Sequence, residues 1–301
     1  MTPERPPEEL EGTISWQELA AEAADALRGR ADVEQPEREG RWIVEEASGL
    51  AGADWVRQAG EPATQRGVAR VDAMVARRAT GVPIQQVLGR WAFRALDLLV
   101  DERVLIPRPE TEGVVDVALV ELDRAAGPRP GRVVDLGTGS GAIALAIALE
   151  RPGTEVWAVE RSPAALAVAR ANLAGLGMAG RHVRMVEGSW FGALPDELAG
   201  SFDLVVANPP YVAEHEELPA AVRDHEPIEA LVPGPTGLEA YVEIVAEAPR
   251  WLAPGGALVL ELGAAQGPSV ATLAAEARLV EVRVERDLAG LDRTLVAHRP
   301  S

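Results

Sequence analysis

The pattern of apolar and polar positions separates the N-terminal part of the chain from the rest. From residue 15 to about residue 78, apolar residues recur at helical spacing, as in SWQELAAEAADAL, RWIVEEASGL and VARVDAMVARRATG. Gly81, with Pro83 two residues on, is typical of the end of a helix. No segment of this region alternates as a strand does. The pattern predicts a small all-α domain over residues 13–82, with its amphipathic helices packed on one another.

The segments on either side of this domain have a different character. Residues 1–12 are rich in Pro and Glu, which predicts a disordered lead-in rather than a signal peptide. Residues 83–109 contain two short β-like runs, LDLLV and RVLI, and two prolines around Arg108. This composition predicts a β-hairpin connector that leads into a second domain.

From residue 132 onward the chain alternates apolar runs, glycine-rich turns and helical segments. Strands are expected at VVDL, EVWAVE, HVRMVE, LVVA, GGALVLEL, LVEVRVERD and RTLVAHR. Apolar runs separated by helices indicate a parallel sheet covered on both faces. Only the short link DLAGLD joins the last two runs, so this pair should be antiparallel. We predict an α/β, Rossmann-like domain over residues 110–301, with seven strands and an antiparallel last strand.

Composition and charge exclude several classes of chemistry. The chain has no Cys, which excludes disulfides, iron–sulfur clusters and cysteine nucleophiles. All 29 basic residues are Arg, so Schiff-base lysines and the P-loop lysine are absent. The four His residues are scattered without metal-ligand spacing, and no metal site is expected.

With a net charge of −18, the chain lacks the excess of basic residues that is typical of nucleic-acid binders. The same charge would favour a basic protein partner. No run is long enough to span a membrane. We therefore expect no membrane association, no direct nucleic-acid binding and a cytoplasmic location.

A glycine-rich turn, DLGTGSG at residues 135–141, lies where the first strand of this sheet meets a helix. Such a turn lets the backbone approach a ligand, although it also fits a dinucleotide fingerprint or a tight turn without a ligand. Two carboxylates favour S-adenosylmethionine. Asp135 could reach an ammonium group directly or through water, at a place where a pyrophosphate would be repelled. Glu160 ends the next strand and could accept both ribose hydroxyls, or it could simply precede the helix cap at Ser162.

The tetrapeptide Asn208-Pro209-Pro210-Tyr211 follows the fourth strand, at the edge where ligands bind in open α/β sheets. An amide or aromatic amine is a poor nucleophile because its lone pair is delocalised. The Asn208 side chain and the Pro209 carbonyl can each accept one of its N–H groups and aim the nitrogen at a methyl sulfonium. Tyr211 can stack on the planar group. This would be catalysis by positioning, not by a titrating base. The alternative is a proline turn that ends a strand.

Taken together, these motifs resemble those of the glutamine-N5 methyltransferases that modify peptide chain release factors at the Gln of a Gly-Gly-Gln loop. The matching pieces are PIQQVLG, VDERVLIPRPETE, VVDLGTGSGAIALA, GSWF, NPPY, HEP, LEL and DLAGLDR. They cover residues 83–299, and the helical domain matches more loosely. NPPY is shared with adenine-N6 methyltransferases. IPRPETE is more particular to the release-factor enzymes, and the relatives that act on a ribosomal protein differ just after the Pro-Arg step.

The resemblance implies S-adenosyl-L-methionine as cofactor, S-adenosyl-L-homocysteine as product, and release factors as partners of a monomeric enzyme whose helical domain recognises the substrate. Asn208 and Pro209 would be catalytic, and Pro210 and Tyr211 would complete the glutamine site. Two positions depart from the family, because Glu160 and Ser189 stand where Asp is usual. The cofactor-binding residues implied are Asp135, Gly137, Thr138, Gly139, Ser140, Gly141, Glu160, Ser189, Trp190 and Asn208.

Other functions stay open at this point. They are N5 methylation of a ribosomal protein's glutamine, adenine-N6 methylation of RNA or DNA, cofactor binding without catalysis, and a dinucleotide oxidoreductase, which leaves NPPY unexplained. Arg108 and Glu110 could be functional, or Arg108 could form a salt bridge that ties the two domains together. His225 could shape the substrate entrance or be merely solvated, and we do not expect it to be catalytic.

Overall fold

The computed structural model describes residues 11–301, and the chain forms two compact units. The first unit holds the chain up to Arg90 together with Pro219–His225, and the second holds Trp91–Leu218 and Glu226–Ser301. The predicted disordered lead-in, residues 1–12, lies outside the described residues except for its last two. Glu11 and Gly12 begin a strand, so for them that prediction is wrong.

The first unit is built mainly of helices, which pack through one apolar cluster that includes Leu27, Ile43 and Val71. Ser15 and Glu18 form a capping box at the start of the first long helix, because the Glu18 N–H donates to Ser15 Oγ at 3.3 Å and the Ser15 N–H donates to Glu18 Oε2 at 2.9 Å. The elements are β1 (Glu11–Ser15), α1 (Trp16–Leu27), α2 (Pro36–Ser48), α3 (Ala53–Gln58), β2 (Pro62–Thr64), α4 (Gln65–Ala79), α5 (Ile84–Leu88) and α9 (Ala220–Arg223).

The prediction that this domain is all-α is wrong in one respect, since β1 and β2 pair as a small antiparallel sheet. β2 has only three residues, too few to show alternation, and β1 runs directly into the cap of α1. Each strand precedes a helix, and its last residue, Ser15 or Thr64, caps that helix.

The connector forms a hairpin, but not with both of the predicted runs. The strands are β3 (Arg90–Phe93) and β4 (Leu96–Leu99), which make a two-stranded sheet. The RVLI run, residues 103–106, is not a strand. The Ile106 N–H there donates to the buried carboxylate of Glu226 at 3.0 Å, and Pro107 has no N–H to offer a sheet.

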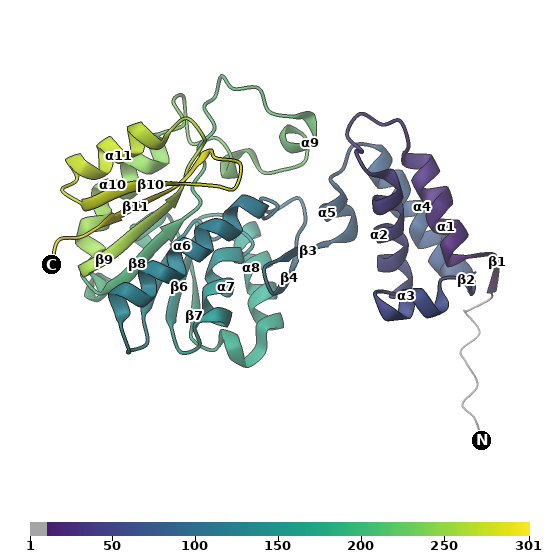
Figure 1. Cartoon of the computed structure of the whole chain (residues 1–301), viewed down its shortest axis with the longest axis horizontal. Coiled ribbons are helices and arrows are strands. Elements are labelled where there is room, and N and C mark those ends of the chain that lie inside the picture. The colour runs from purple at the N-terminus through teal and green to yellow at the C-terminus, as the bar shows by residue number, and fades with distance from the viewer. Residues whose placement is uncertain (1–10) are drawn as a thin grey trace. The chain divides into compact units, whose positions relative to one another are not determined.

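The second unit contains the predicted seven-stranded sheet, in the order β10-β11-β9-β8-β5-β6-β7 (Figure 1). The strands from β5 to β9 are parallel, and β11 is antiparallel to both β9 and β10. The antiparallel last strand is therefore confirmed, and it is inserted between β9 and β10. The strands are β5 (Arg132–Leu136), β6 (Glu155–Glu160), β7 (Val183–Glu187), β8 (Phe202–Ala207), β9 (Leu252–Glu261), β10 (Val280–Arg286) and β11 (Asp292–His298).

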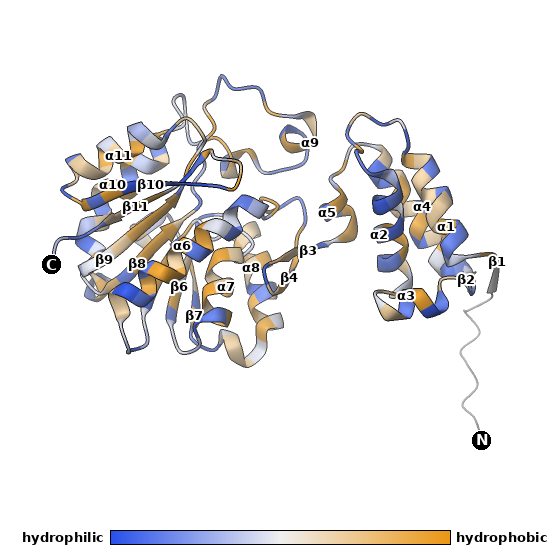
Figure 2. Ribbon diagram, viewed as in Figure 1, coloured by the Kyte–Doolittle hydropathy of each residue, from blue (hydrophilic) through white to orange (hydrophobic). Residues whose placement is uncertain are grey.

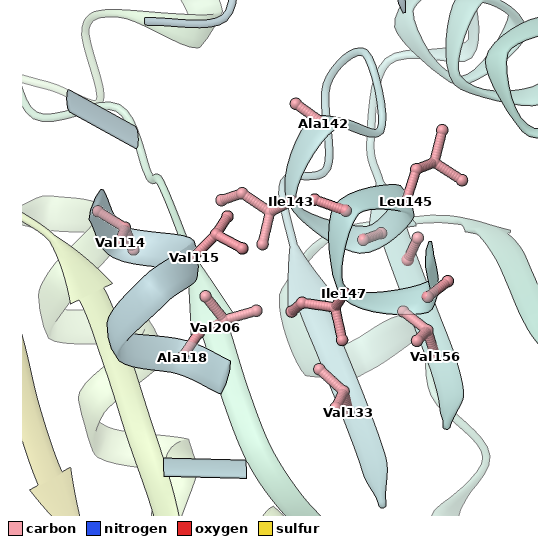
Figure 3. Packing of buried hydrophobic residues seen from close by; sticks show 14 of the residues in the cluster. Val114, Val115, Ala118, Val133, Ala142, Ile143, Leu145, Ile147, Val156 and Val206 are labelled. Carbon is pink, nitrogen blue, oxygen red and sulfur yellow. The ribbon is translucent and has the colours of Figure 1, made fainter. Parts of the chain in front are cut away.

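Helices cover the sheet on both faces, as the buried strands require. On one face α6 (Pro109–Ala126) and α7 (Ala142–Glu150) pack on Val133, Val156 and Val206 (Figure 3), and α8 (Pro163–Leu176) belongs to the same apolar cluster. The other face carries α10 (Glu239–Trp251) and α11 (Gly267–Glu276). Short 3₁₀ helices complete the unit: η1 (Gly177–Gly180), η2 (Trp190–Ala193), η3 (Asp196–Leu198) and η4 (Ile228–Ala230).

Burial explains why α7 has no polar face. Every residue from Ala142 to Ala148 is buried, and Figure 2 shows the helix in the hydrophobic colour. A helix enclosed in this way is held rigidly, and its first residues follow the glycine-rich turn.

In the described part of the chain, no helix is long and apolar enough to cross a membrane.

Candidate active site

The turns that follow β5, β6, β7 and β8 line one pocket at the carboxyl edge of the sheet. Neighbouring parallel strands end at the same edge, which brings together segments that are far apart in the sequence. Asp135, Gly141, Pro209 and Tyr211 are close in sequence to the lining but do not contribute to it. The predicted site residues that do line the pocket are Gly137, Thr138, Gly139, Ser140, Glu160, Ser189, Trp190, Asn208 and Pro210.

The glycine-rich turn has a conformation that side chains other than hydrogen disfavour. Gly137, Gly139 and Gly141 have φ values of 73°, 56° and 88°, all in the left-handed region. The N–H groups of Gly137 and Thr138 both donate to the Val159 carbonyl at 2.9 Å, which fixes the turn to β6. The turn is therefore rigid and exposes backbone to the pocket.

Glu160 joins two of the loops that line the pocket. Its Oε2 accepts the Gly139 N–H at 2.9 Å, and its Oε1 accepts the Ser162 N–H at 2.9 Å. Ser162 is the N-cap of α8, so the alternative interpretation of Glu160 as a neighbour of a helix cap is confirmed, while its contact with a ribose stays a prediction. Each carboxylate oxygen keeps a lone pair with which to accept a further donor. One side chain thus shapes the turn and offers acceptors to the pocket.

Asp135 lies beneath the turn and is almost completely buried. Its Oδ2 accepts the Thr138 hydroxyl at 2.5 Å and the Ala144 N–H at 3.1 Å, while Oδ1 has no hydrogen-bond partner among residues 11–301. Burial raises the pKa of Asp135 to about 7, and the charge of Glu160 adds to this effect. The structure therefore gives Asp135 a role in supporting the turn, and its contact with a ligand ammonium stays a prediction.

Trp190 borders the pocket from the start of η2. It has a positive φ of 44° and is only partly buried. A Cβ built on Gly137 would lie 3.4 Å from its ring, an ordinary van der Waals contact, so the positive φ of 73° and not a lack of space favours glycine there. Ser189, the N-cap of η2, lines the pocket beside it.

Asn208 contacts Thr111, and Thr111 in turn contacts Glu261; sequence reasoning missed both of these residues. Its Nδ2 donates to Thr111 Oγ1 at 3.3 Å, and the Thr111 hydroxyl donates to Glu261 Oε2 at 2.6 Å. Thr111 lies in the first turn of α6 and Glu261 is the last residue of β9. The sequence held one signal for them: Thr111 lies in PETE and Glu261 in LEL, two of the pieces that match the release-factor enzymes. The roles of these two pieces could not be assigned from sequence.

The Glu261 carboxyl and the Tyr211 hydroxyl both have raised pKa values. Burial raises the pKa of Glu261 to about 7, with Arg293 and Arg108 opposing the shift and Glu110 adding to it. Burial likewise raises the pKa of Tyr211 to about 12, so its hydroxyl is un-ionised at neutral pH. The Tyr211 carbonyl accepts Gln266 Nε2 at 2.9 Å, which fixes the end of the NPPY segment.

Arg108 lines the pocket and forms an ion pair with Glu226, which is buried. Both residues belong to the second unit, so the interpretation that this salt bridge ties the two domains together is wrong. Glu226 instead fixes the connector to the segment after NPPY. The His225 carbonyl accepts Gln86 Nε2 at 2.7 Å within the first unit, and His225 does not line the pocket.

Comparisons with known proteins agree with this architecture. The family model described as "Methyltransferase small domain" matches residues 116–225, and the one described as "PrmC N-terminal domain" matches residues 18–89. The chain is 40% identical to a release factor glutamine methyltransferase of Cereibacter sphaeroides, over 93% of this chain and 99% of that protein. It is 44% identical to the one of Gloeobacter violaceus, over 85% of this chain and 88% of that protein.

A crystal structure of a methyltransferase from Pyrococcus furiosus has a similar fold, with a TM-score of 0.50 and 19% identity over 76% of this chain and 98% of that chain. The seven-stranded sheet and the pocket at its carboxyl edge define a Rossmann-like methyltransferase. Within that class, the chain belongs to the family of release factor glutamine methyltransferases. The resemblance inferred from the motifs is confirmed.

Proposed function

We propose that this protein transfers a methyl group from S-adenosylmethionine to the side-chain amide nitrogen of the Gln in the Gly-Gly-Gln loop of peptide chain release factors. One observation carries the proposal. The glycine-rich turn and Glu160, which suit a nucleoside cofactor, line the same pocket as Asn208 and Pro210, which suit a planar amide. The family to which the chain belongs supplies the substrate class.

The residues of the pocket fit S-adenosylmethionine. Glu160 keeps acceptor capacity for a ribose diol, and the backbone of residues 137–140 would border the methionine half. Ser189 and Trp190 would border the adenine, with the Ser189 hydroxyl as an uncharged partner for its amino group. Asp135 Oδ1 has no hydrogen-bond partner among residues 11–301, but Asp135 is buried outside the pocket lining, so it would reach the ammonium group through water. The cofactor supplies an electrophilic methyl group on a sulfonium.

The chain itself would act by holding the acceptor nitrogen in place. The Asn208 Oδ1 and the Pro209 carbonyl would each accept one N–H of the substrate amide and aim its nitrogen at the methyl group. Pro209 is buried and has no N–H that could compete for these acceptors. Tyr211, whose pKa is raised to about 12, would stack on the amide and would not act as a base.

We also propose that the first unit recognises the release factor, since the segment from residue 18 to residue 89 matches a domain particular to this family. A net charge of −18 favours a basic protein surface over a nucleic acid. In this proposal the protein is a cytoplasmic monomer that does not bind nucleic acid directly.

The test is methyl transfer from labelled S-adenosylmethionine to a purified release factor. We expect label in the release factor, and none when the Gln of its Gly-Gly-Gln sequence is replaced by Asn, whose amide is one methylene shorter. Total ribosomal protein and total RNA serve as competing acceptors in parallel reactions. Label confined to a ribosomal protein or to RNA, or label that persists in the altered release factor, would contradict the proposal.

A further inference from the structure

Three side chains from distant parts of the sequence form a hydrogen-bonded series that ends at the proposed acceptor site. Asn208 follows β8, Thr111 belongs to the first turn of α6, and Glu261 ends β9. The two contacts are 3.3 Å from Asn208 Nδ2 to Thr111 Oγ1 and 2.6 Å from Thr111 Oγ1 to Glu261 Oε2. Thr111 and Glu261 are 4% and 1% exposed, so water does not readily replace either partner.

The direction of these hydrogen bonds follows from the donors available. An ionised carboxylate only accepts hydrogen bonds, and a hydroxyl has a single proton to donate. When Glu261 is ionised, Thr111 must give that proton to Glu261, because a buried carboxylate without a donor is costly. The hydroxyl oxygen then has only lone pairs left for Asn208. Asn208 must therefore turn its NH₂ toward Thr111, and its Oδ1 is left for another partner.

With Glu261 ionised, the reverse orientation of the amide would not satisfy this series. With Oδ1 facing Thr111, two oxygens would compete for one hydroxyl proton, and either Glu261 or Asn208 would lose its donor. The NH₂ of Asn208 would then face a substrate amide that also presents N–H groups, so donor would meet donor. The series thus selects the one orientation that supports catalysis by positioning.

We infer that Thr111 and Glu261 are positioning residues, which fix the orientation of the Asn208 amide so that its Oδ1 accepts an N–H of the substrate. The inference rests on the proposed function, since it assigns these residues a role in that reaction. Neither residue needs to touch the substrate for this role. The series requires the ionised form of Glu261. Burial opposes that form and raises the pKa of Glu261 to about 7, with Glu110 adding to the effect, whereas the Thr111 hydroxyl, Arg293 and Arg108 favour ionisation, so the series is complete above about pH 7.

The experiment compares Thr111→Val, Thr111→Ser and Glu261→Gln with the wild-type protein, by steady-state methylation of a release factor. Valine keeps the shape of threonine but loses the hydroxyl. We expect kcat to fall about tenfold or more while KM for S-adenosylmethionine stays unchanged, as for a lost preorganised interaction. Serine keeps the hydroxyl and should restore kcat to within about threefold. Glutamine in place of Glu261 can present either end to Thr111, so its kcat should lie between these two values.

Two controls separate positioning from a structural role. Thr272→Val changes an exposed threonine on α11 in the same unit and should leave kcat unchanged. Thr111→Val combined with Asn208→Ala should be no slower than Asn208→Ala alone, because Thr111 acts only through Asn208. Thermal unfolding and binding of S-adenosylhomocysteine show whether each variant is folded.

The outcomes are distinguishable. A wild-type protein that does not methylate the release factor refutes the proposed function, and the inference falls with it. An active wild type with unchanged kcat in folded Thr111→Val, or losses that multiply in the double variant, refutes the inference alone. If Thr111→Val does not fold, a wild-type kcat in folded Glu261→Gln overturns it from the other end of the series.

Discussion

The amide of Asn208 has a donor end and an acceptor end, and the site uses them for different purposes. The NH₂ end is bound inside the protein by Thr111, which leaves the oxygen for the pocket. Glu160 similarly uses lone pairs of its two oxygens to hold backbone N–H groups and retains others. At the scale of single residues, the same side chains that shape the site also supply its binding groups.

Replacing Asn208 by Ala should separate binding from catalysis. In the proposed site the methyl donor would bind mainly through the loops after β5, β6 and β7, so its affinity should change little. Turnover should fall by roughly a hundredfold, the usual cost of losing a preorganised hydrogen-bonding group. Calorimetry with S-adenosylhomocysteine and single-turnover methylation measure the two quantities. An unchanged turnover would eliminate Asn208 as an acceptor for the substrate amide.

Glu160→Ala should have the opposite effect and weaken cofactor binding. The variant loses the proposed ribose acceptor and also the link between Gly139 and Ser162. Loss of hydrogen bonds to a charged group should reduce affinity by roughly tenfold to a hundredfold. Glu160→Asp keeps the carboxylate and should be closer to wild type. Wild-type affinity in Glu160→Ala, measured by calorimetry, would remove this residue from the site.

The buried Asp135 predicts a pH dependence of stability. Its pKa in the folded chain is about 7, above its usual value, so the folded chain retains a proton that the unfolded chain has released. Between about pH 4 and 7 this carboxyl therefore lowers the free energy of unfolding as pH rises, by at most about 1.4 kcal/mol per pH unit.

Asp135→Asn can still accept from Thr138 and Ala144 but has no charge to bury. Relative to wild type, its free energy of unfolding should rise as pH increases through this window. Denaturant titrations at several pH values measure the difference, with the exposed Glu276→Gln as control. A difference in free energy of unfolding that does not vary with pH would mean that burial does not raise the pKa of Asp135.

At the scale of elements, the close approach of two helix backbones explains why residue 40 is glycine, which the pattern of apolar and polar positions does not explain. A Cβ on Gly40 of α2 would lie 2.7 Å from the Ala24 nitrogen and 2.8 Å from the Ala20 oxygen of α1. The two helices can pack at this separation only with glycine there.

Gly40→Ala should therefore destabilise the first unit, although alanine is normally the better helix former. Overpacking against backbone should lower the free energy of unfolding by about 1–3 kcal/mol. Gly60→Ala, at an exposed position of the same unit with open space around it, should have a small effect. Equal stabilities of the two variants in denaturant titrations would show that α1 and α2 separate without cost.

At the scale of the whole molecule, periodicity and loop length were sufficient to predict the helical region, the seven strands and the antiparallel last strand. The β1–β2 pair was missed because β2 is too short to alternate and β1 runs directly into the cap of α1. RVLI was misassigned because the Ile106 N–H donates to Glu226, 120 residues away, and not to a neighbouring strand.

The two contiguous motifs, DLGTGSG and NPPY, located the pocket from sequence, although only some of their residues line it. Thr111 and Glu261 could not be assigned in advance. They lie 97 residues before and 53 residues after Asn208, and only the packed sheet brings the three together.

The central claim is that this protein methylates one particular glutamine by means of Asn208. The most direct test is tandem mass spectrometry of the Gly-Gly-Gln peptide of a release factor, after incubation with the protein and S-adenosylmethionine. The account predicts one added methyl group on the side-chain nitrogen of that Gln with the wild-type protein, and almost none in the same time with Asn208→Ala. A methyl group on another atom or residue, or equal methylation by both proteins, would contradict it.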